Sequence, residues 1–340
     1  MADAQKAEKI PLKLRLKAWW EGYDVNDMKN RLKSDDSADD VGNADATSTE
    51  SSDEPKAVPA PEAAVSESKE RLSGNLAVLP WDETRMEISQ LVWGEGYCGP
   101  GGPDHIKTMS KLLAMTPEMS AAVVGAGLGG PCRVMAEEFG VWITGYEESP
   151  ELAKKGMSIS TMAGLGKKAE ISSYDPNSEE PFNRRFDRAF SKEALYTVKE
   201  KGNLLTKMFE KLKDDALFLI SDYTLSGPEV LEDDNVQKWL KQEINRPYPV
   251  TAEMMTAMLE KAGFMLRVNE DISDLYIDLI AKSWSNADKI AATLATDNGE
   301  NCPEIGVLMK EASFWSLRAK LLKEKKIHVW RFLAYKPAES

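Results

Sequence analysis

The stretch AAVVGAGLGGPCRVMAEEFGVWITGYEESP, residues 121–150, places a glycine-rich loop between two apolar runs and is followed at once by acidic residues. The run 121–126 predicts a buried strand, the segment after the glycines predicts a helix, and 141–147 predicts a second strand. A phosphate-binding P-loop would continue with Lys and then Ser or Thr, whereas Gly-Pro-Cys-Arg follows here. We therefore expect this loop to face a ligand without a phosphate.

The same alternation of strands and helices continues along the chain. Further apolar strands are predicted at 168–174, 186–191, 216–223, 265–271 and 327–335. Helical patterns lie at 131–139, 150–163, 201–212, 251–262 and 306–325. Short apolar strands separated by helices are typical of parallel βαβ units and of a sheet covered on both faces. The long helical insertion 272–325 before the last strand predicts a cap beside the sheet.

The composition limits which classes of partner, which cofactors and which cellular compartment are expected. The formal net charge of −13 argues against nucleic acid as the main partner. Three cysteines without paired spacing argue against a disulfide framework, and no Cys, His and Asp cluster has the spacing of a metal site. The chain start lacks the apolar core of a signal peptide, and no apolar run reaches the roughly 18 residues of a membrane span. We expect a cytoplasmic protein without a metal.

Three zones differ in composition. Residues 1–33 form a basic segment that contains PLKLRLKAWWEGYD, and 34–72 are rich in Asp, Ser, Ala, Glu and Pro, with no aromatic residue. Such a composition cannot bury enough apolar surface to offset its ordering entropy, so 34–72 is predicted to be a disordered acidic linker. The globular domain is expected to cover 73–340.

The basic segment 1–33 has three possible roles. Lysines and leucines followed by Trp19 and Trp20 can lie at an anionic membrane surface. The same residues can dock as a short peptide on a partner protein, held by a flexible tether. They can also form a helix that packs on the globular domain.

The glycine loop and the following strand suggest a nucleoside site. Four glycines, Gly125, Gly127, Gly129 and Gly130, allow the backbone to approach a ligand closely. Glu147 ends the next strand, 22 positions after Gly125, where a carboxylate can accept hydrogen bonds from both hydroxyls of a ribose. Nicotinamide dehydrogenases share this arrangement, so the pair of features fits more than one cofactor class.

Two further polar positions narrow the cofactor class. Asp175 follows the third strand, where it can take an adenine amino group or cap a turn, and Ser191 ends the fourth strand. Together with the glycine loop and Glu147, this order is the one used by class I S-adenosylmethionine-dependent methyltransferases. A dehydrogenase is disfavoured by the terminal strand VWRFLAYKP and the insertion before it.

From about residue 81 to 337, the chain resembles the phosphoethanolamine N-methyltransferases. The segments that carry the resemblance are WGEGYCGPGG (93–102), FDRAFSKEALYTV (186–198), LISDY (219–223), EINRPYPVTAEMM (243–255) and FWSLRAK…VWRFLAYKP (314–337). The resemblance implies a Rossmann-like class I methyltransferase sheet of the α/β class with a helical cap insertion, preceded by the disordered linker. It also implies S-adenosyl-L-methionine as the cofactor.

The resemblance assigns roles to individual residues. Tyr97 and Cys98 border the methionine end of the cofactor. Gly125, Gly127, Gly129 and Ser191 also belong to the expected cofactor site, with Glu147 at the ribose and Asp175 at the adenine. Glu193 lies near the methyl acceptor. Arg246, Tyr248 and Arg318 hold the substrate phosphate, a task that suits the planar fork of arginine. Without the resemblance, either arginine could be a solvated surface charge.

Three positions depart from the pattern of this family. Val123 stands where an acid usually precedes the glycine loop. Trp81 and Thr197 stand where the family has a Tyr and a His that form a catalytic latch. Neither side chain can take a proton from an ammonium near neutral pH, because indole is only a donor and a hydroxyl is a poor base. We assign Trp81 to the substrate site.

Methyl transfer depends mainly on aligning the nucleophile with an activated methyl group in a dry pocket. An amine acceptor must also lose a proton, which Glu193, or a water held by Tyr223 or Tyr248, can take. The expected function is an S-adenosylmethionine-dependent methyltransferase acting on a small molecule, either an amine or a phospho-amine such as phosphoethanolamine, or a related acceptor. The alternative is a catalytically weak relative that acts as a scaffold or regulator, tethered through 1–33.

Overall fold

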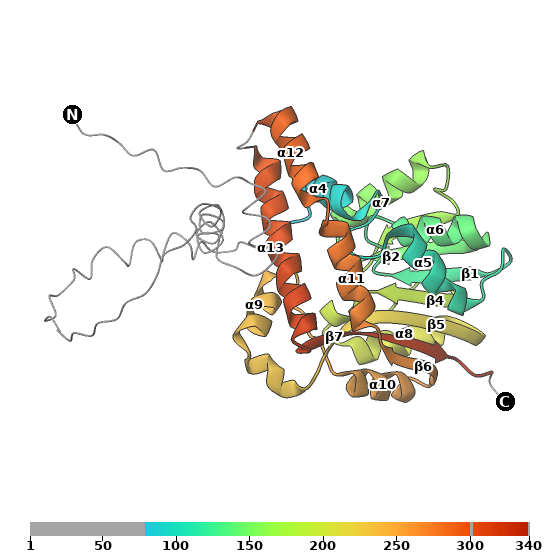
Figure 1. The fold of residues 1–340 in the computed structure, drawn as a ribbon. Coiled ribbons are helices and arrows are strands. Elements are labelled where there is room, and N and C mark those ends of the chain that lie inside the picture. The colour runs from blue at the N-terminus through green and yellow to red at the C-terminus, as the bar shows by residue number, and fades with distance from the viewer. Residues whose placement is uncertain (1–78, 300–301, 339–340) are drawn as a thin grey trace, which may run out of the picture. The chain divides into compact units, whose positions relative to one another are not determined.

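The computed structural model describes residues 79–299 and 302–338 (Figure 1). The basic segment 1–33, the linker 34–72 and the expected domain boundary at residue 73 lie outside these residues and stay predictions. Within the described ranges, no helix is long and apolar enough to cross a membrane.

A seven-stranded sheet with the order β3-β2-β1-β4-β5-β7-β6 forms the centre of the fold. Its strands are β1 (Ser120–Val124), β2 (Trp142–Glu147), β3 (Ala169–Ser173), β4 (Phe186–Lys192), β5 (Leu212–Leu225), β6 (Met265–Asp271) and β7 (Ile327–Tyr335). Neighbouring strands from β3 to β5 are parallel. All seven predicted strands are confirmed, and β5 is longer than predicted.

The last strand corrects one expectation, because the sheet is mixed and not wholly parallel. β7 runs antiparallel to both of its neighbours, β5 and β6. The helices between β6 and β7 do not cross the sheet, so the chain re-enters at the end where β6 left it. A parallel strand there would need a crossover along the whole sheet.

Helices cover both faces of the sheet. The connecting helices are α6 (Gly130–Phe139), α7 (Pro150–Met162), α8 (Lys201–Lys211) and α10 (Ala252–Lys261). Apolar residues of α8 and α10 pack in one core with Ala122 and Val124, which lie on the same face of β1 because side chains alternate along a strand. α6 lies on the opposite side of the sheet from α10 (Figure 1).

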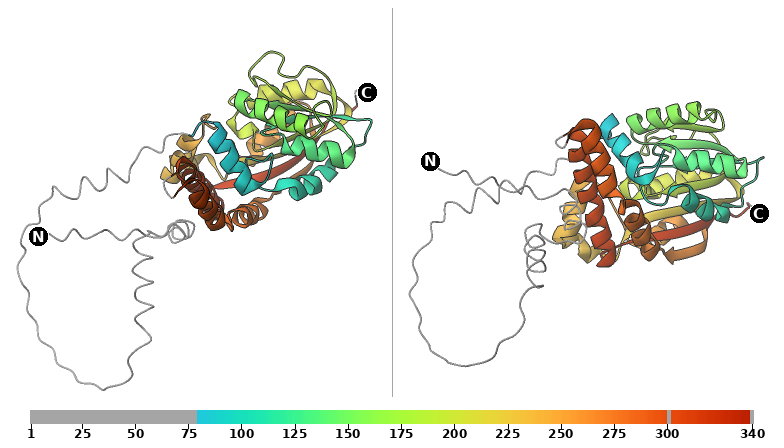
Figure 2. Two further views of the ribbon diagram at one scale, coloured as in Figure 1. Left: turned by 90° about the horizontal axis from the view of Figure 1, so that it is seen from above. Right: turned by 45° about the horizontal axis from the view of Figure 1, so that its top comes forward.

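The predicted cap is confirmed as three helices between β6 and β7. They are α11 (Ser273–Trp284), α12 (Ala287–Asn298) and α13 (Pro303–Lys323). Figures 1 and 2 show α12 and α13 at one end of the sheet, away from its faces. Three further helices are α4 (Glu83–Trp93), α5 (Gly102–Ser110) and α9 (Asp234–Gln242). α4 and α9 pack on α13, and α5 packs on α6.

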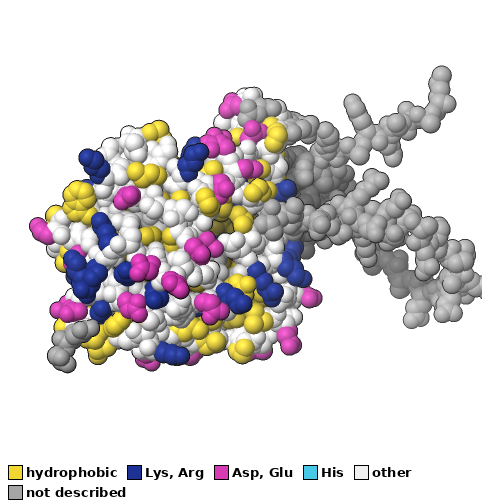
Figure 3. Space-filling model, turned by 180° about the vertical axis from the view of Figure 1, so that it is seen from behind, with side chains coloured by type: hydrophobic (Ala, Val, Ile, Leu, Met, Phe, Trp, Pro, Cys, Tyr) yellow, Lys and Arg dark blue, Asp and Glu magenta, His cyan; other side chains and the backbone are white. Residues whose placement is uncertain are grey.

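On the face seen from behind, Lys and Arg side chains are interspersed with Asp and Glu side chains (Figure 3). The outer surface on this side is therefore of mixed charge, in spite of the net negative charge of the chain. This distribution differs from that of the cavity described below.

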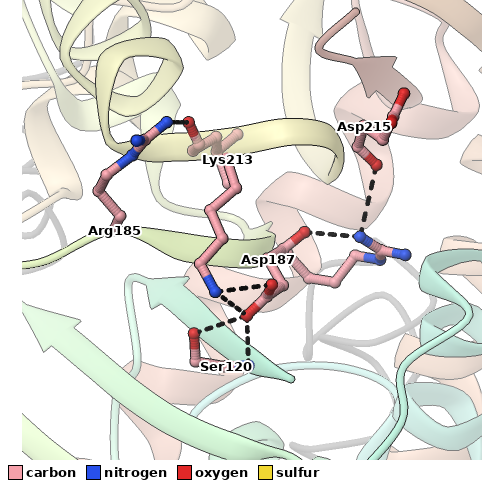
Figure 4. Close-up of polar contacts among 7 residues, drawn as sticks. Ser120, Arg185, Asp187, Lys213 and Asp215 are labelled. Carbon is pink, nitrogen blue, oxygen red and sulfur yellow. Dashed lines mark hydrogen bonds and ion pairs between the residues drawn. The ribbon is translucent and has the colours of Figure 1, made fainter. Parts of the chain in front are cut away.

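A polar cluster joins the amino ends of β1, β4 and β5 (Figure 4). Asp187 accepts hydrogen bonds from the backbone N–H and the hydroxyl of Ser120, at 2.9 and 3.0 Å. Lys213 donates to both oxygens of the same carboxylate, at 2.8 and 2.9 Å. One side chain thus ties three strands together at the end of the sheet far from the glycine loop.

Replacing Asp187 with Ala is expected to lower the free energy of unfolding at pH 7 by about 1–3 kcal/mol, because the Ser120 N–H loses its partner. Partial burial alone raises the pKa of Asp187, but hydrogen bonds from Lys213 and Ser120 outweigh it and the pKa is lowered. A carboxyl with a lowered pKa stabilises the fold above its unfolded pKa of about 3.9, and this stabilisation is lost as the pH falls through the folded value. The difference in the free energy of unfolding between wild type and variant should therefore become smaller as the pH is lowered towards about pH 3.

Urea unfolding at both pH values measures this difference. Asp214→Ala, which removes an exposed carboxylate from the same region, is the matched control. An Asp187→Ala defect of equal size at both pH values would contradict the assignment of the stabilisation to the charged carboxylate.

Candidate functional site

A cavity of about 720 Å³ lies at the carboxyl ends of the parallel strands. The glycine loop after β1 and the residues that follow β2 and β4 line it, together with the start of α4 and part of α13. The strand order reverses between β1 and β4, since β2 lies on one side of β1 and β4 on the other. Open sheets of this type bind ligands at such a reversal.

The glycine loop needs its glycines for two different reasons. Gly125 and Gly127 both have positive φ, 76° and 55°, where other residues are strained. A Cβ at Gly125 would in addition collide with the Cβ of Ala194, whereas a Cβ at Gly127 would meet no atom within 4 Å. Gly125 therefore permits packing against the segment after β4, and Gly127 leaves open space beside the cavity.

Glu147 ends β2 and faces this loop. One carboxylate oxygen accepts the backbone N–H of Gly127 at 2.7 Å, and the other accepts that of Ser149 at 3.0 Å. The residue is only 8% exposed, and burial raises its pKa although both hydrogen bonds lower it. Each oxygen retains a second acceptor position, so the side chain can still accept two hydroxyl donors from a ligand in the cavity.

Glu148, the neighbouring acid, also lines the cavity, although no role was predicted for it. Glu148 is half-buried, and burial raises its pKa in spite of a hydrogen bond with Asn245. Both Glu148 and Asn245 line the cavity. The adjacent acids at 147–148 are the sequence feature that could have indicated it.

The predicted adenine contact lies at the margin of this region. Asp175 is exposed and does not line the cavity, and its carboxylate accepts the backbone N–H of Asn177 at 2.8 Å. This is the turn cap considered as the alternative. The ring of Tyr174, one residue earlier, lines the cavity instead. The adenine role of Asp175 stays a prediction.

Residues 96–99 line the cavity beside the glycine loop, because the backbone N–H of Gly130 donates to the carbonyl of Gly96 at 2.9 Å. Tyr97 is 6% exposed, and its hydroxyl is buried without a hydrogen-bond partner among the described residues. Burial raises the pKa of Cys98 to about 12, so its thiol stays protonated at neutral pH. Both residues line the cavity.

Glu193 follows β4 directly and has a positive φ of 53°. Its carboxylate forms an ion pair with Lys192, accepts the hydroxyl of Tyr223 at 3.4 Å, and is about 10% exposed. A left-handed backbone in a non-glycine residue is costly and is frequent at functional sites. The carboxylate lies at the cavity wall, where Lys192 and Tyr223 hold it.

Arg318 of α13 lies in an aromatic surrounding at the same end of the cavity. Its guanidinium donates to the hydroxyl of Tyr196 at 2.9 Å and forms an ion pair with Glu243. The guanidinium carbon lies 4.3 Å from the ring centre of Phe314 and 4.6 Å from that of Trp315. Its Nε is buried without a hydrogen-bond partner in the described part of the chain.

A second arginine of the cavity lining pairs with a residue of α13. Arg85 of α4 lies 3.9 Å from the ring centre of Trp81 and forms a buried ion pair with Glu311 of α13 at 2.6 Å. This pair could not be predicted from the sequence, because its residues are 226 positions apart and leave no local pattern. Trp81 and Thr197, the two positions of the absent latch, both line the cavity.

The structure thus brings most of the predicted site residues together. Those that line the cavity are Trp81, Tyr97, Cys98, Gly125, Gly127, Glu147, Glu193 and Arg318. Those outside its lining are Gly129, Asp175, Ser191, Tyr223, Arg246 and Tyr248.

Some of the predicted site residues outside the cavity lining are buried, and others are exposed to solvent. Tyr223 is buried beneath Glu193, and the Ser191 hydroxyl is buried without a partner in the described chain. Arg246 is exposed, and Tyr248 is 38% exposed. Among residues 79–299 and 302–338, no group of three or more His, Cys, Asp or Glu is arranged to hold a metal ion.

Comparison with known proteins finds methyltransferases and agrees with the fold. A family model described as a methyltransferase domain matches residues 124–267. A phosphoethanolamine N-methyltransferase from Triticum aestivum is 27% identical over 227 residues, which are 64% of this chain and 43% of that protein. The Plasmodium falciparum (isolate 3D7) protein of the same name is 25% identical over 198 residues, 57% of this chain and 72% of that protein. The chain thus spans less than half the length of the Triticum relative.

Solved structures share the fold at lower identity. Haemonchus contortus phosphoethanolamine N-methyltransferase 2 in complex with S-adenosyl-L-methionine has a TM-score of 0.65 and 18% identity, over 76% of this chain and 58% of that one. A putative sarcosine dimethylglycine methyltransferase from Galdieria sulphuraria has a TM-score of 0.61 and 13% identity, over 76% of this chain and 99% of that one. The chain therefore shares its fold with these methyltransferase structures, matches a methyltransferase domain over residues 124–267, and is similar in sequence to phosphoethanolamine N-methyltransferases.

Proposed function

We propose that the cavity binds S-adenosyl-L-methionine and that the protein transfers its methyl group to a small-molecule amine. The observation that carries the proposal is Glu147, a buried carboxylate that is fixed by two backbone N–H groups beside a glycine loop. The matched methyltransferase domain and the relatives described above support the same assignment.

The cavity residues fit the parts of this cofactor. Glu147 would accept the two ribose hydroxyls, and the backbone at Gly125 and Gly127 would lie against the chain that carries the methionine group. Tyr97 and Cys98 would border the methionine group, since both line the cavity. The ring of Tyr174 offers an apolar wall for the base.

When bound, the cofactor would supply a methyl group on a positively charged sulfur. The sulfur would keep the electron pair of the carbon–sulfur bond when the methyl group is transferred. The residues of the chain orient the acceptor, exclude water and take its proton. Glu193 is the proton acceptor, because its carboxylate lines the cavity and its position is held by Lys192 and Tyr223. The rings of Trp81, Phe314 and Trp315 line the cavity, and they would shield the methyl acceptor beside Glu193 from solvent. We call this part of the cavity the acceptor end.

A second function, a cofactor-binding scaffold or regulator, is favoured by Trp81 and Thr197, since neither can act as the base of the family's latch. One assay separates the two functions. The full chain is incubated with radiolabelled S-adenosylmethionine and a panel of small amines and phospho-amines, and binding of S-adenosylhomocysteine is measured by calorimetry. Transfer to one acceptor class supports the enzyme. Binding without transfer to any acceptor supports the regulator, and no binding contradicts both.

A further inference from the structure

Among the residues that the structure describes, the cavity has no basic side chain outside an ion pair to receive a phosphate. Among the described residues that line it, three are basic, Arg85, Lys192 and Arg318. Each forms an ion pair with a glutamate that also lines the cavity, Glu311, Glu193 and Glu243 respectively. All six side chains are at most about 11% exposed, so the ion pairs are buried. Within each pair, the positive and the negative charge largely neutralise each other.

The remaining charges of the lining are acidic. Asp82 and Glu151 are exposed at the rim, and Glu147 and Glu148 lie further inside. A bound S-adenosylmethionine brings one net positive charge, which reduces this excess without reversing it. A phosphate monoester with nearly two negative charges would therefore enter a field of its own sign, in contrast to the mixed charge of the outer surface in Figure 3.

The two residues expected to hold a phosphate by resemblance do not change this balance. Arg246 is exposed and outside the cavity lining, as is Tyr248. The third, Arg318, is inside the cavity but is already neutralised by Glu243, whose carboxylate also accepts the indole N–H of Trp239 at 2.8 Å. To bind a phosphate, Arg318 would have to give up this buried partner, and Glu243 would be left uncompensated beside the incoming anion.

We infer that the methyl acceptor is a small amine without a phosphate group. This inference rests on the proposed function, whose cavity it describes. The rings of Tyr196, Phe314 and Trp315 line the cavity together with Glu193. An ammonium is favoured in this cavity for two reasons: aromatic faces stabilise cations, and the acids outside the three ion pairs leave the lining with a net negative charge.

The inference can be tested with Glu243→Gln, which should free Arg318 for an anion. The amide is of nearly the same shape, and its oxygen can still accept from Trp239 and Arg318, so the fold should be kept. Phosphoethanolamine is titrated by calorimetry into the full chain saturated with S-adenosylhomocysteine. The variant is expected to bind phosphoethanolamine at least about tenfold more tightly than the wild type, through a charge-assisted pair with Arg318. Glu148→Gln, which removes one lining charge without freeing an arginine, is the matched control and should gain less.

Binding of phosphoethanolamine by the wild type at least as tightly as by Glu243→Gln would overturn the inference. A comparison on the wild type alone is independent of how the variant folds: labelled methyl should pass to ethanolamine and its N-methylated forms in preference to phosphoethanolamine, and the reverse preference would also overturn it. Failure of S-adenosylhomocysteine to bind the wild type would count against the proposed function instead, so the two failures are distinguishable.

Discussion

Replacing Glu147 with Ala is expected to weaken the binding of S-adenosylhomocysteine at least about 100-fold. The variant loses two acceptors for the ribose hydroxyls, and hydrogen bonds to a charged group contribute about 1.5–3 kcal/mol each. It also leaves the N–H groups of Gly127 and Ser149 without their partner, so the glycine loop is no longer fixed in the binding conformation. Titration calorimetry on wild type and variant measures the change.

Glu151→Ala is the matched control, because Glu151 is an exposed acid of the same cavity rim. Its effect on the dissociation constant should stay within about threefold, since exposed charges contribute little. Thermal melting of both variants separates a local defect from unfolding. Equal affinities of wild type and a folded Glu147→Ala variant would show that the ribose does not lie at this carboxylate.

Replacing Glu193 with Gln is expected to lower the rate of methyl transfer by about 10²–10⁴, the usual contribution of a positioned general base. The amide keeps the shape of the side chain but cannot take the proton of the acceptor. Binding of S-adenosylhomocysteine should be nearly unchanged, because Glu193 lies at the acceptor end of the cavity and Glu147 holds the other end. The defect should therefore appear in kcat more than in the cofactor Kd.

The pH dependence gives this variant a second readout. At high pH the acceptor amine loses its proton to water, so the rate of Glu193→Gln should rise with pH and approach that of the wild type. A merely structural role of Glu193 would give a defect that does not recover with pH. A Glu193→Gln variant with unchanged kcat at neutral pH would contradict the assignment of the base.

The fold could be predicted in large part from the sequence because its strands are short apolar runs and its connecting helices are amphipathic. The direction of β7 could not, since a run such as 327–335 has the same pattern in a parallel and in an antiparallel pair. Helices α4, α5 and α9 were not predicted. α4 and α9 pack on α13, and α5 packs on α6, so tertiary contacts help to stabilise all three.

The site, too, has one part that could be predicted from the sequence and one part that could not. Glu147 and the loop 125–127 follow from position, because the end of a strand and the turn before a helix determine where their groups lie. The acceptor end depends on pairs of residues from distant elements. Arg318 and Glu243 are 75 positions apart and occupy helix α13 and the segment just after α9, so only the packed fold brings them together. The likeness to phosphate-binding relatives gave Arg318 a role that its buried partner argues against.

The most direct measurement of the central claim is a crystal structure of the full chain with S-adenosylhomocysteine. We expect the nucleoside in the cavity between the glycine loop and the segment 94–99, with both ribose hydroxyls donating to the Glu147 carboxylate. A nucleoside bound elsewhere, or a cavity that stays empty at saturating ligand while Glu147 keeps only its two backbone partners, would contradict the account.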